Sequence, residues 1–366
     1  MAEIRVDHLH KAFGGFTAVR DSTFTVRDGE FFCLLGPSGC GKTTTLRTIA
    51  GLELPTSGRI LLGGEDVTFK RASKRDIAFV FQLFALYPHM NVRANIAYPL
   101  RSQGVRPAEV AQRVEGAARI LRIAPLLERS VSGLSSGDRQ RVALGRAIVR
   151  EPLAFLLDEP LGALDAEFRE VMCGELRALH DRLKVTTVYV THDQLEAMAM
   201  ADTIALMNQG VMEQMGTPQD IYDRPATLFV ADFIGSPPMS FVPFRGRVAP
   251  GDRSVRIGEV EIPLPEVREG SADAELVLGV RPESIRLSSD APFRAEVLDA
   301  EYLGTTQIIT LATAAGARLK ARISADLDVR PGEHTGLTFQ QSKLSLFDKA
   351  SGRALRSALH DGAAHG

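Results

Sequence analysis

Residues 36 to 44, GPSGCGKTT, bring glycines, a lysine and two threonines together at the spacing of a phosphate-binding loop. Glycines let the backbone turn its N–H groups inward around an anion, and Lys42 adds a positive charge for the outer phosphates. The Thr43 hydroxyl can bind Mg²⁺. A strand-like run, FFCLLG, leads into the segment and a helical pattern follows. The segment therefore predicts a nucleotide site, and its predicted contacts are Gly36, Ser38, Gly39, Cys40, Gly41, Lys42, Thr43 and Thr44.

An acidic pair follows a second apolar run, in LAFLLDEP at residues 153 to 160. The run predicts a buried strand ending at Asp158, whose carboxylate can bind Mg²⁺ directly or through water. Glu159 is then placed to polarise a water molecule that attacks a phosphate. Taken alone, such a string usually marks the turn after a strand. Downstream of a phosphate-binding loop it predicts magnesium-dependent phosphoryl transfer.

A third segment, LSSGDRQ at residues 134 to 140, runs directly into the helical pattern RVALGRAIV. The first turn of a helix has unpaired N–H groups and the positive end of the helix dipole, so Ser135 and Gly137 can offer a seat to an anion. Asp138 stands beside this seat, where it would repel a phosphate. We expect its side chain to point along the helix toward Arg139 or Arg141, which would leave Ser135 and Gly137 free to bind.

Composition limits the possible functions. The 366 residues leave room for two or three domains, and 43 basic against 45 acidic residues give no overall field for nucleic acid or membrane. Three cysteines fit a reducing compartment. Cys40 lies in the phosphate-binding loop, where thiol modification would block a nucleotide; the alternative is a small residue that simply fits. The first residues lack the apolar stretch of a secretory signal, so we expect none, and no run of about 20 apolar residues occurs, so we expect work at a membrane to need a partner.

The chain is expected to fold as two domains. Over residues 1–235, β-rich runs alternate with helical patterns, which predicts an α/β domain with a mostly parallel sheet and a helical insert at about 87–150. Paired prolines in GSPPMSF precede turn-separated strand patterns, which predict an all-β domain over 236–350. Residues 351–366 are expected to form a disordered tail with solvated histidines, His360 and His365.

The motifs, in their order along the chain, resemble those of the nucleotide-binding subunits of ABC transporters. They are the phosphate loop, FVFQ, the Ser/Gly signature, LLDEP, LGALD and VTHD. Further segments resemble the ATPases of maltose and glycerol-phosphate type bacterial importers, among them YPHMNVRANIAYPL and LGVRPESI. The resemblance covers nearly the whole chain and weakens over its last fifty or so residues. It implies a P-loop NTPase fold of the ABC type and a C-terminal OB-like (TOBE-type) domain.

The resemblance also implies roles for single residues, with ATP and Mg²⁺ as cofactors. Catalytic roles fall to Glu159 as base, His192 as the contact to the γ-phosphate and Gln82 as the link between magnesium, water and the membrane partner. Thr43, Gln82 and Asp158 would hold the metal, Phe13 would stack on adenine, and Asp165 would cross between subunits. The chain departs from the family's Leu-Ser-Gly-Gly-Gln at Ser136 and Asp138, and LGALD departs from Ser-Asn-Leu-Asp.

In this family two copies pack head to tail around two ATP molecules, so each signature caps the nucleotide of the other copy. The resemblance implies two transmembrane permease subunits, a periplasmic or extracellular solute-binding protein, and a peripheral location at the cytoplasmic face of the plasma membrane. The imported compound is expected to be a sugar or polyol. Phe84, Leu86, Tyr87 and Met90 are expected to contact the permease, although some of them could be core residues.

Two other functions remain open at the level of sequence. The altered signature would suit a catalytically weak partner in a heterodimer. A soluble ABC ATPase of DNA repair or translation is the other, but the chain has no long coiled-coil insertion and a single nucleotide domain. Only five tyrosines and no tryptophan occur, and no basic strand carries interleaved aromatic residues, so we expect no nucleic-acid binding.

Overall fold

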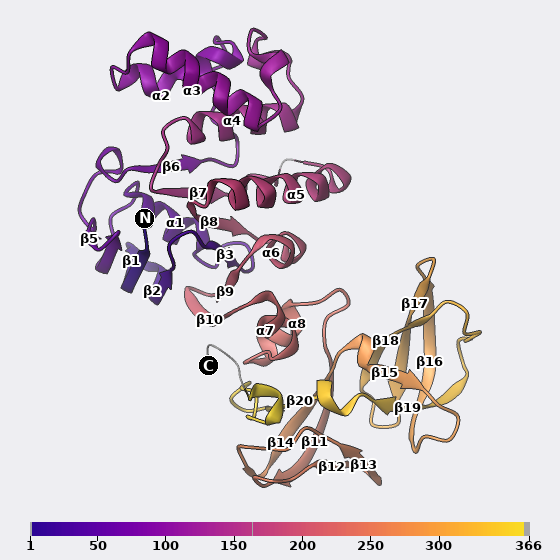
Figure 1. The fold of residues 1–366 in the computed structure, drawn as a ribbon. Coiled ribbons are helices and arrows are strands. Elements are labelled where there is room, and N and C mark those ends of the chain that lie inside the picture. The colour runs from indigo at the N-terminus through magenta and orange to yellow at the C-terminus, as the bar shows by residue number, and fades with distance from the viewer. Residues whose placement is uncertain (1, 163, 362–366) are drawn as a thin grey trace. The chain divides into compact units, whose positions relative to one another are not determined.

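The computed structural model describes residues 2–162 and 164–361. The chain forms two compact units, Met1–Pro218 and Gln219–Gly366. The first contains a large sheet with helices, and the second contains smaller sheets (Figure 1). None of the helices in the described ranges has both the length and the apolar composition needed to span a bilayer.

A ten-stranded sheet forms the centre of the first unit, in the order β5-β4-β1-β2-β10-β9-β3-β8-β7-β6. Its strands are β1 Ile4–Phe13, β2 Phe16–Val26, β3 Phe31–Leu35, β4 Ser57–Leu62, β5 Glu65–Asp66, β6 Ile77–Val80, β7 Ala154–Asp158, β8 Thr186–Thr191, β9 Thr203–Asn208 and β10 Val211–Gly216. Strands β9, β3, β8, β7 and β6 run parallel. Strands β1, β2, β4 and β5 are antiparallel, so the predicted α/β class is confirmed but the sheet is mixed.

The parallel strands are buried because helices cover the sheet. All residues of β3 and β7 are buried, which explains why these runs are apolar without alternation. The helices of this part are α1 Lys42–Ala50, α5 Ala166–Leu183 and α6 Gln194–Met200, with a short 3₁₀ turn, η1 Ala72–Lys74. Parallel strands end at the same edge of the sheet, so the loops after β3, β6, β7 and β8 meet there.

The helical insert lies between β6 and β7 in the chain (Figure 1). It contains α2 Val92–Ser102, α3 Pro107–Ile120 and α4 Ser136–Ile148, with the 3₁₀ turns η2 Ala124–Leu126 and η3 Val131–Gly133. Helix α3 begins with a proline, whose missing N–H is harmless at that position. Its predicted apolar face is buried: Val110, Val114, Ala117 and Leu121 are at most 8% exposed.

The second unit is built mainly from antiparallel strands. They form sheets of three strands (β11-β14-β20), two strands (β12-β13) and five strands (β15-β19-β16-β17-β18). The strands are β11 Ser240–Val248, β12 Ser254–Ile257, β13 Val260–Pro263, β14 Ser271–Val280, β15 Ile285–Leu287, β16 Phe293–Tyr302, β17 Thr306–Thr313, β18 Arg318–Ser324, β19 His334–Phe339 and β20 Ser345–Asp348. The helical elements are α7 Pro218–Asp223, α8 Leu228–Phe233, η4 Pro282–Ser284, η5 Gln341–Lys343 and η6 Ala358–His360.

The units divide after Pro218, whereas the sequence placed the boundary at residue 235. Helix α8 accounts for part of this difference, because its Ala231 packs with Met239 and Phe347 of the β domain. The buried Arg281 also donates hydrogen bonds to the carbonyls of Tyr222 and Ile234. Short helices cannot be assigned to either neighbouring domain from their own pattern.

The expected tail is ordered over its described part, residues 351–361. Leu355 is buried, and its N–H donates a 2.8 Å hydrogen bond to the Leu346 carbonyl. The His360 ring accepts a hydrogen bond from the Ser357 N–H, and burial lowers the pKa of His360. His360 is therefore part of a turn rather than a solvated side chain. Residues 362–366, which include His365, lie outside the described residues.

Candidate nucleotide site

The phosphate-binding loop connects β3 to α1. Gly36 and Gly41 have φ angles of 152° and 110°, which disfavour other residues. A Cβ atom at Gly36 would lie 2.2 Å from the Met207 carbonyl oxygen, and one at Gly41 would lie 2.4 Å from that of Ala18. Helix α1 begins without a side-chain cap, so its first N–H groups face the loop unpaired by side chains. The loop therefore has the features of an anion seat.

Lys42 is folded into this loop. Its Nζ donates hydrogen bonds of 2.8 Å to the carbonyls of Gly36 and Pro37, and the residue is only 4% exposed. The positive charge thus already lies where phosphates are expected. Cys40 is buried too, and desolvation raises the pKa of its thiol although Lys42 opposes the shift. A protonated, buried thiol reacts poorly, which favours the interpretation of Cys40 as a small residue that fits.

Thr43 and Asp158 form the acidic side of the site. The Thr43 hydroxyl donates a 2.9 Å hydrogen bond to Asp158 Oδ1. Desolvation raises the pKa of Asp158, which is 5% exposed, and the bond from Thr43 opposes this shift. No group of three His, Cys, Asp or Glu residues that could hold a metal occurs in the described ranges. A hydroxyl beside one carboxylate nevertheless fits Mg²⁺, which takes only one or two protein ligands when phosphates and water complete its shell.

The three residues expected to be catalytic lie together at the carboxyl ends of β6, β7 and β8. Glu159 Oε2 is 3.2 Å from His192 Nδ1 and 3.4 Å from Gln82 Nε2. The Glu159 backbone has a φ of 43°, and its N–H donates to the Val190 carbonyl of β8. This conformation is rare for a residue with a side chain, and such residues cluster at functional sites. Glu159 thus has two polar neighbours from two other strand ends.

The signature segment begins α4, with Ser135 as its N-cap. Ser135 Oγ accepts a 3.1 Å hydrogen bond from the Asp138 N–H and donates one of 2.8 Å to Asp138 Oδ2. Arg141, one of the two arginines that the sequence suggested, lies 3.3 Å from Asp138 Oδ1. The expectation that Ser135 is left free is therefore wrong. A short acidic side chain in the first turn reaches back to the cap, which occupies the hydroxyl.

Gly137 and Asp165 are also at helix starts. A Cβ atom on Gly137 would lie 2.1 Å from Phe168 Cε1, so this position has no room for a side chain beside α5. Asp165 caps α5, since its Oδ1 accepts a 2.9 Å hydrogen bond from the Phe168 N–H. Within the described ranges, no hydrogen bond joins Ser135, Gly137 or Asp165 to the phosphate-binding loop. The structure thus brings the phosphate-binding loop together with Asp158, Glu159, Gln82 and His192. The signature residues form no hydrogen bond with this group in the described ranges.

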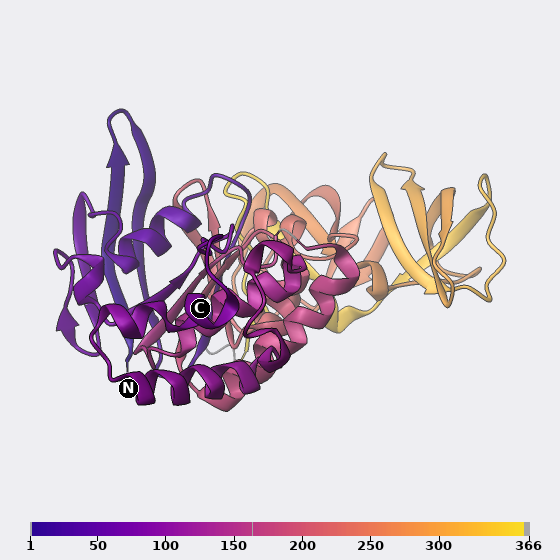
Figure 2. The ribbon, with the colours of Figure 1, turned by 90° about the horizontal axis from the view of Figure 1, so that it is seen from above.

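Phe13 lies at the end of the β1–β2 hairpin, which extends as a long ribbon in indigo (Figure 2). Its side chain is partly available, with the residue 45% exposed. Lys11 Nζ lies 4.3 Å from the ring centroid, which is a cation–π contact. A cation therefore lies over the ring of a side chain that is still partly exposed.

Arg169 of α5 is a residue that the sequence prediction missed. Its Nη1 donates to Asp193 Oδ2 at 2.9 Å and its Nη2 donates to the Leu164 carbonyl at 3.0 Å. It therefore ties the residue before Asp165 to the residue after His192. The only sequence signal is an arginine four residues after Asp165, which is too common on helices to single out.

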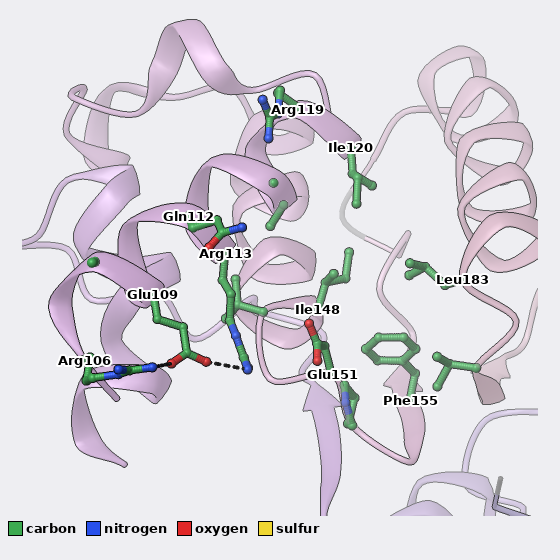
Figure 3. A pocket seen from close by; sticks show the side chains of 16 residues that line it. Arg106, Glu109, Gln112, Arg113, Arg119, Ile120, Ile148, Glu151, Phe155 and Leu183 are labelled. Carbon is green, nitrogen blue, oxygen red and sulfur yellow. Dashed lines mark hydrogen bonds and ion pairs between the residues drawn. The ribbon is translucent and has the colours of Figure 1, made fainter. Parts of the chain in front are cut away.

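A hollow that the described residues form lies away from this site. It has a volume of about 1000 Å³ and is lined by α3 on one side and by the ends of β7 and α5 on the other (Figure 3). None of the predicted nucleotide residues lines it.

Comparison with protein families gives three matches. A model described as ABC transporter matches residues 19–162, a MalK OB fold domain matches 235–285, and a TOBE domain matches 278–347. A solved structure, cbiO1 from Clostridium perfringens, described as part of the ABC transporter complex cbiONQ, matches with a TM-score of 0.56 at 26% identity. It covers 60% of this chain and 89% of its own.

Relatives match over nearly the full length. The trehalose/maltose import ATP-binding protein MalK of Thermococcus litoralis is 46% identical over 97% of this chain and all of its own. The trehalose import ATP-binding protein SugC of Mycobacterium tuberculosis is 45% identical, covering 97% and 98%. The sn-glycerol-3-phosphate import ATP-binding protein UgpC of Cereibacter sphaeroides is 44% identical, covering 97% and 100%. The chain therefore belongs to the ABC transporter family, as one of its ATP-hydrolysing subunits.

Proposed function

We propose that two copies of this chain bind two ATP molecules between them and use hydrolysis to drive a membrane permease that imports a sugar or polyol. The observation that carries the proposal is the cluster of Glu159, His192 and Gln82 beside the Thr43–Asp158 pair. The proposed base, Glu159, and the proposed magnesium-binding pair thus lie at the same edge of the sheet.

Each residue of the cluster has a task that its position suits. The backbone N–H groups of the loop and Lys42 bind the outer phosphates, and Thr43 and Asp158 hold the metal. Mg²⁺, when bound, neutralises charge on the phosphates. Glu159 accepts the proton of the attacking water, His192 contacts the γ-phosphate, and Gln82 links the metal site with the water. No step requires a covalent bond to the chain.

The proposal of a dimer rests on the signature. Ser135 and Asp165 are exposed at helix starts, and in the described ranges no hydrogen bond joins either of them to the phosphate-binding loop. Helix N-termini attract anions, so these two starts are suited to a nucleotide held by a second copy. Asp138 then faces a triphosphate with like charge, partly compensated by Arg141 and by the hydroxyl of Ser135.

The proposed permease contact lies on the segment after Gln82. Leu83 is 83% exposed, and Leu86, Tyr87 and Met90 are partly exposed. Phe84 is buried, so it belongs to the core, as the sequence left open. Relatives named as import proteins for trehalose, maltose and glycerol phosphate support a sugar or polyol as cargo and a peripheral place at the cytoplasmic face of the membrane. A solute-binding protein would deliver that cargo to the permease.

A second candidate is a catalytically weak partner in a heterodimer. The bond between Ser135 and Asp138 favours it, because the signature hydroxyl is already occupied. ATP turnover measured at rising concentrations of the purified chain distinguishes the homodimer from the heterodimer. The Glu159→Gln variant, which lacks the proposed base, is the negative control. Specific turnover that rises with chain concentration and disappears in the negative control supports the homodimer. ATP binding without turnover at every concentration would point to the heterodimer.

A further inference from the structure

Arg75 is a buried arginine of the first unit. It lies between η1 and β6, and the residue is only 1% exposed. Burial lowers the pKa of its guanidinium, and the exposed carboxylate of Asp66 opposes this shift, but no ion pair joins Arg75 to an acid in the described ranges. A guanidinium stays charged at neutral pH, so the fold holds a positive charge out of water. Burying a charge is costly, and its position therefore needs a physical reason.

The hydrogen bonds of Arg75 go to backbone carbonyls, two of them at the end of α1. Nη1 donates at 2.8 Å to the carbonyls of Thr48 and Ile49, which belong to the last turn of that helix. Nε donates to the Lys70 carbonyl at 2.9 Å, and Nη2 donates to the Thr68 carbonyl at 2.8 Å. All four acceptors are uncharged, so they satisfy the N–H groups of the guanidinium without neutralising it.

Gly51, which follows α1, leaves the space that the guanidinium occupies. Its φ angle is 71°, and its N–H donates to the carbonyls that end the helix. A Cβ atom at this position would lie 2.5 Å from Nε and 2.8 Å from Cζ of Arg75. A glycine in the left-handed conformation is the usual residue after a helix. Here it also lets a cation lie directly against the C-terminal end of α1.

The other end of α1 is the phosphate-binding loop. The helix begins at Lys42 and has nine residues, so its two ends are about 13 Å apart. Its last carbonyls carry a partial negative charge, and its first N–H groups carry a partial positive charge. A cation against the carbonyls offsets the negative end. The field at the loop is then determined by the N–H groups and by Lys42, both of which attract an anion.

Burial decides whether a charge at this distance has an effect. Salt screens exposed charges over about 8 Å, so an exposed cation about 13 Å from the loop would add little. A buried charge is screened much less, and its attraction for a multiply charged anion is retained. A neutral amide could donate to the same carbonyls at a lower desolvation cost. Pairing of the carbonyls alone therefore does not explain why a charged group is buried here.

We propose that Arg75 is a positioning residue that acts through α1: its buried charge offsets the negative end of the helix and strengthens the binding of phosphates at the opposite end. The inference rests on the proposed function, in which the loop binds the outer phosphates of ATP. It adds to that site a group that touches neither nucleotide nor metal. Since the effect is electrostatic, it grows with the negative charge of the ligand.

Nucleotide affinity, measured without turnover, tests this role. Arg75→Gln keeps an amide donor but removes the charge, and dissociation constants are measured for ATP and ADP with Mg²⁺ and for adenosine. We expect affinity to fall about fivefold for ATP and about twofold for ADP and to stay the same for adenosine, because the lost attraction follows the charge of the ligand. Lys74→Gln is the matched control. Lys74 is the neighbouring residue and is exposed, so the same loss of charge is expected to change none of the three constants.

Arg75→Lys separates the charge from the hydrogen bonds. Lysine keeps the charge, but its compact ammonium cannot reproduce the planar fork of donors. We expect this variant to bind ATP within about twofold of the wild type, although urea unfolds it at a lower concentration. Arg75→Met is the neutral variant to use if Arg75→Gln does not fold.

Two results would overturn the inference. One is equal loss of affinity for ATP, ADP and adenosine in the neutral variant, or no loss at all. The other is equal loss of ATP affinity in Arg75→Lys and Arg75→Gln, which would mean that Arg75 only supports the helix. Failure of the proposed function is distinct from both, since it would appear as a wild-type chain that binds ATP but shows no turnover dependent on Glu159.

Discussion

The hydroxyl of Ser135 donates a 2.8 Å hydrogen bond to the carboxylate of Asp138, and the Asp138 N–H returns one of 3.1 Å to the same hydroxyl. The N-cap residue Ser135 and the first-turn residue Asp138 of α4 thus hydrogen-bond to each other. In the proposed dimer this pair must loosen before Ser135 can donate to a phosphate of the partner's nucleotide. The pair therefore opposes closure of the site.

Replacing Asp138 with glutamine is expected to raise ATP turnover. The substitution removes a negative charge near the proposed γ-phosphate and frees the serine hydroxyl, and loss of about 0.7 kcal/mol of repulsion corresponds to about a threefold increase in rate. Steady-state kcat measures the effect. Ser136→Gly, the other departure in the signature, leaves the Ser135–Asp138 pair intact and is expected to change kcat little. A kcat that stays the same or falls in Asp138→Gln would contradict this explanation.

Gly137→Ala is expected to destabilise the first unit by about 1–3 kcal/mol, because the added Cβ would overlap the Phe168 ring. Urea unfolding followed by circular dichroism measures the change. Gly116→Ala is the matched control, since a Cβ there meets nothing within 4 Å and the residue lies inside α3. That control is expected to stabilise the protein by roughly 0.5–1 kcal/mol. Equal effects of the two substitutions would contradict the packing argument.

The pH dependence of stability is expected to reflect Asp158. Burial raises the pKa of this carboxyl in the folded chain, so the charged form opposes folding at neutral pH. This penalty is fully present above the folded-state pKa and disappears below the unfolded value of about 3.9. Asp158→Asn is therefore expected to be more stable than the wild type at pH 7 without nucleotide, and the difference is expected to shrink as the pH falls.

Chemical unfolding at several pH values tests this dependence. Asp158→Asn should meanwhile bind Mg²⁺ with ATP more weakly, because an amide carries no charge to attract the cation. A variant that is less stable than the wild type at pH 7, or a difference that grows toward low pH, would show that burial of the Asp158 charge does not dominate.

The residues that sequence could predict are those whose chemistry is local. The phosphate loop and the Asp158–Glu159 pair each occupy one short segment next to a buried strand, so their pattern already indicates their context. Arg146 donates hydrogen bonds to the carbonyls of Phe84 and Ala85, which lie about sixty residues earlier in the chain. Neither segment has a sequence pattern that predicts contact with the other. Helical spacing predicts Arg141 as a partner of Asp138. The hydrogen bond between the Ser135 hydroxyl and the Asp138 carboxylate depends on the side-chain rotamer of Asp138, which the sequence does not determine.

The domain boundary also depends on contacts that are distant in sequence. Helices α7 and α8 continue the alternating pattern of the first domain, so the sequence placed them there. A packing partner of α8, Phe347, lies more than one hundred residues further along the chain. The fold class, in contrast, follows from period and length alone, because strands buried on both faces and amphipathic helices recur in order.

In the proposed dimer each copy completes the nucleotide site of the other, and the mass of Glu159→Gln in solution tests this most directly. This substitution keeps the fold and the phosphate loop but removes the proposed base, so bound ATP should not be consumed. With ATP and Mg²⁺, light scattering is expected to give about twice the 39.7 kDa of one chain, and one chain mass with ADP. A single-chain mass with saturating ATP would contradict the account.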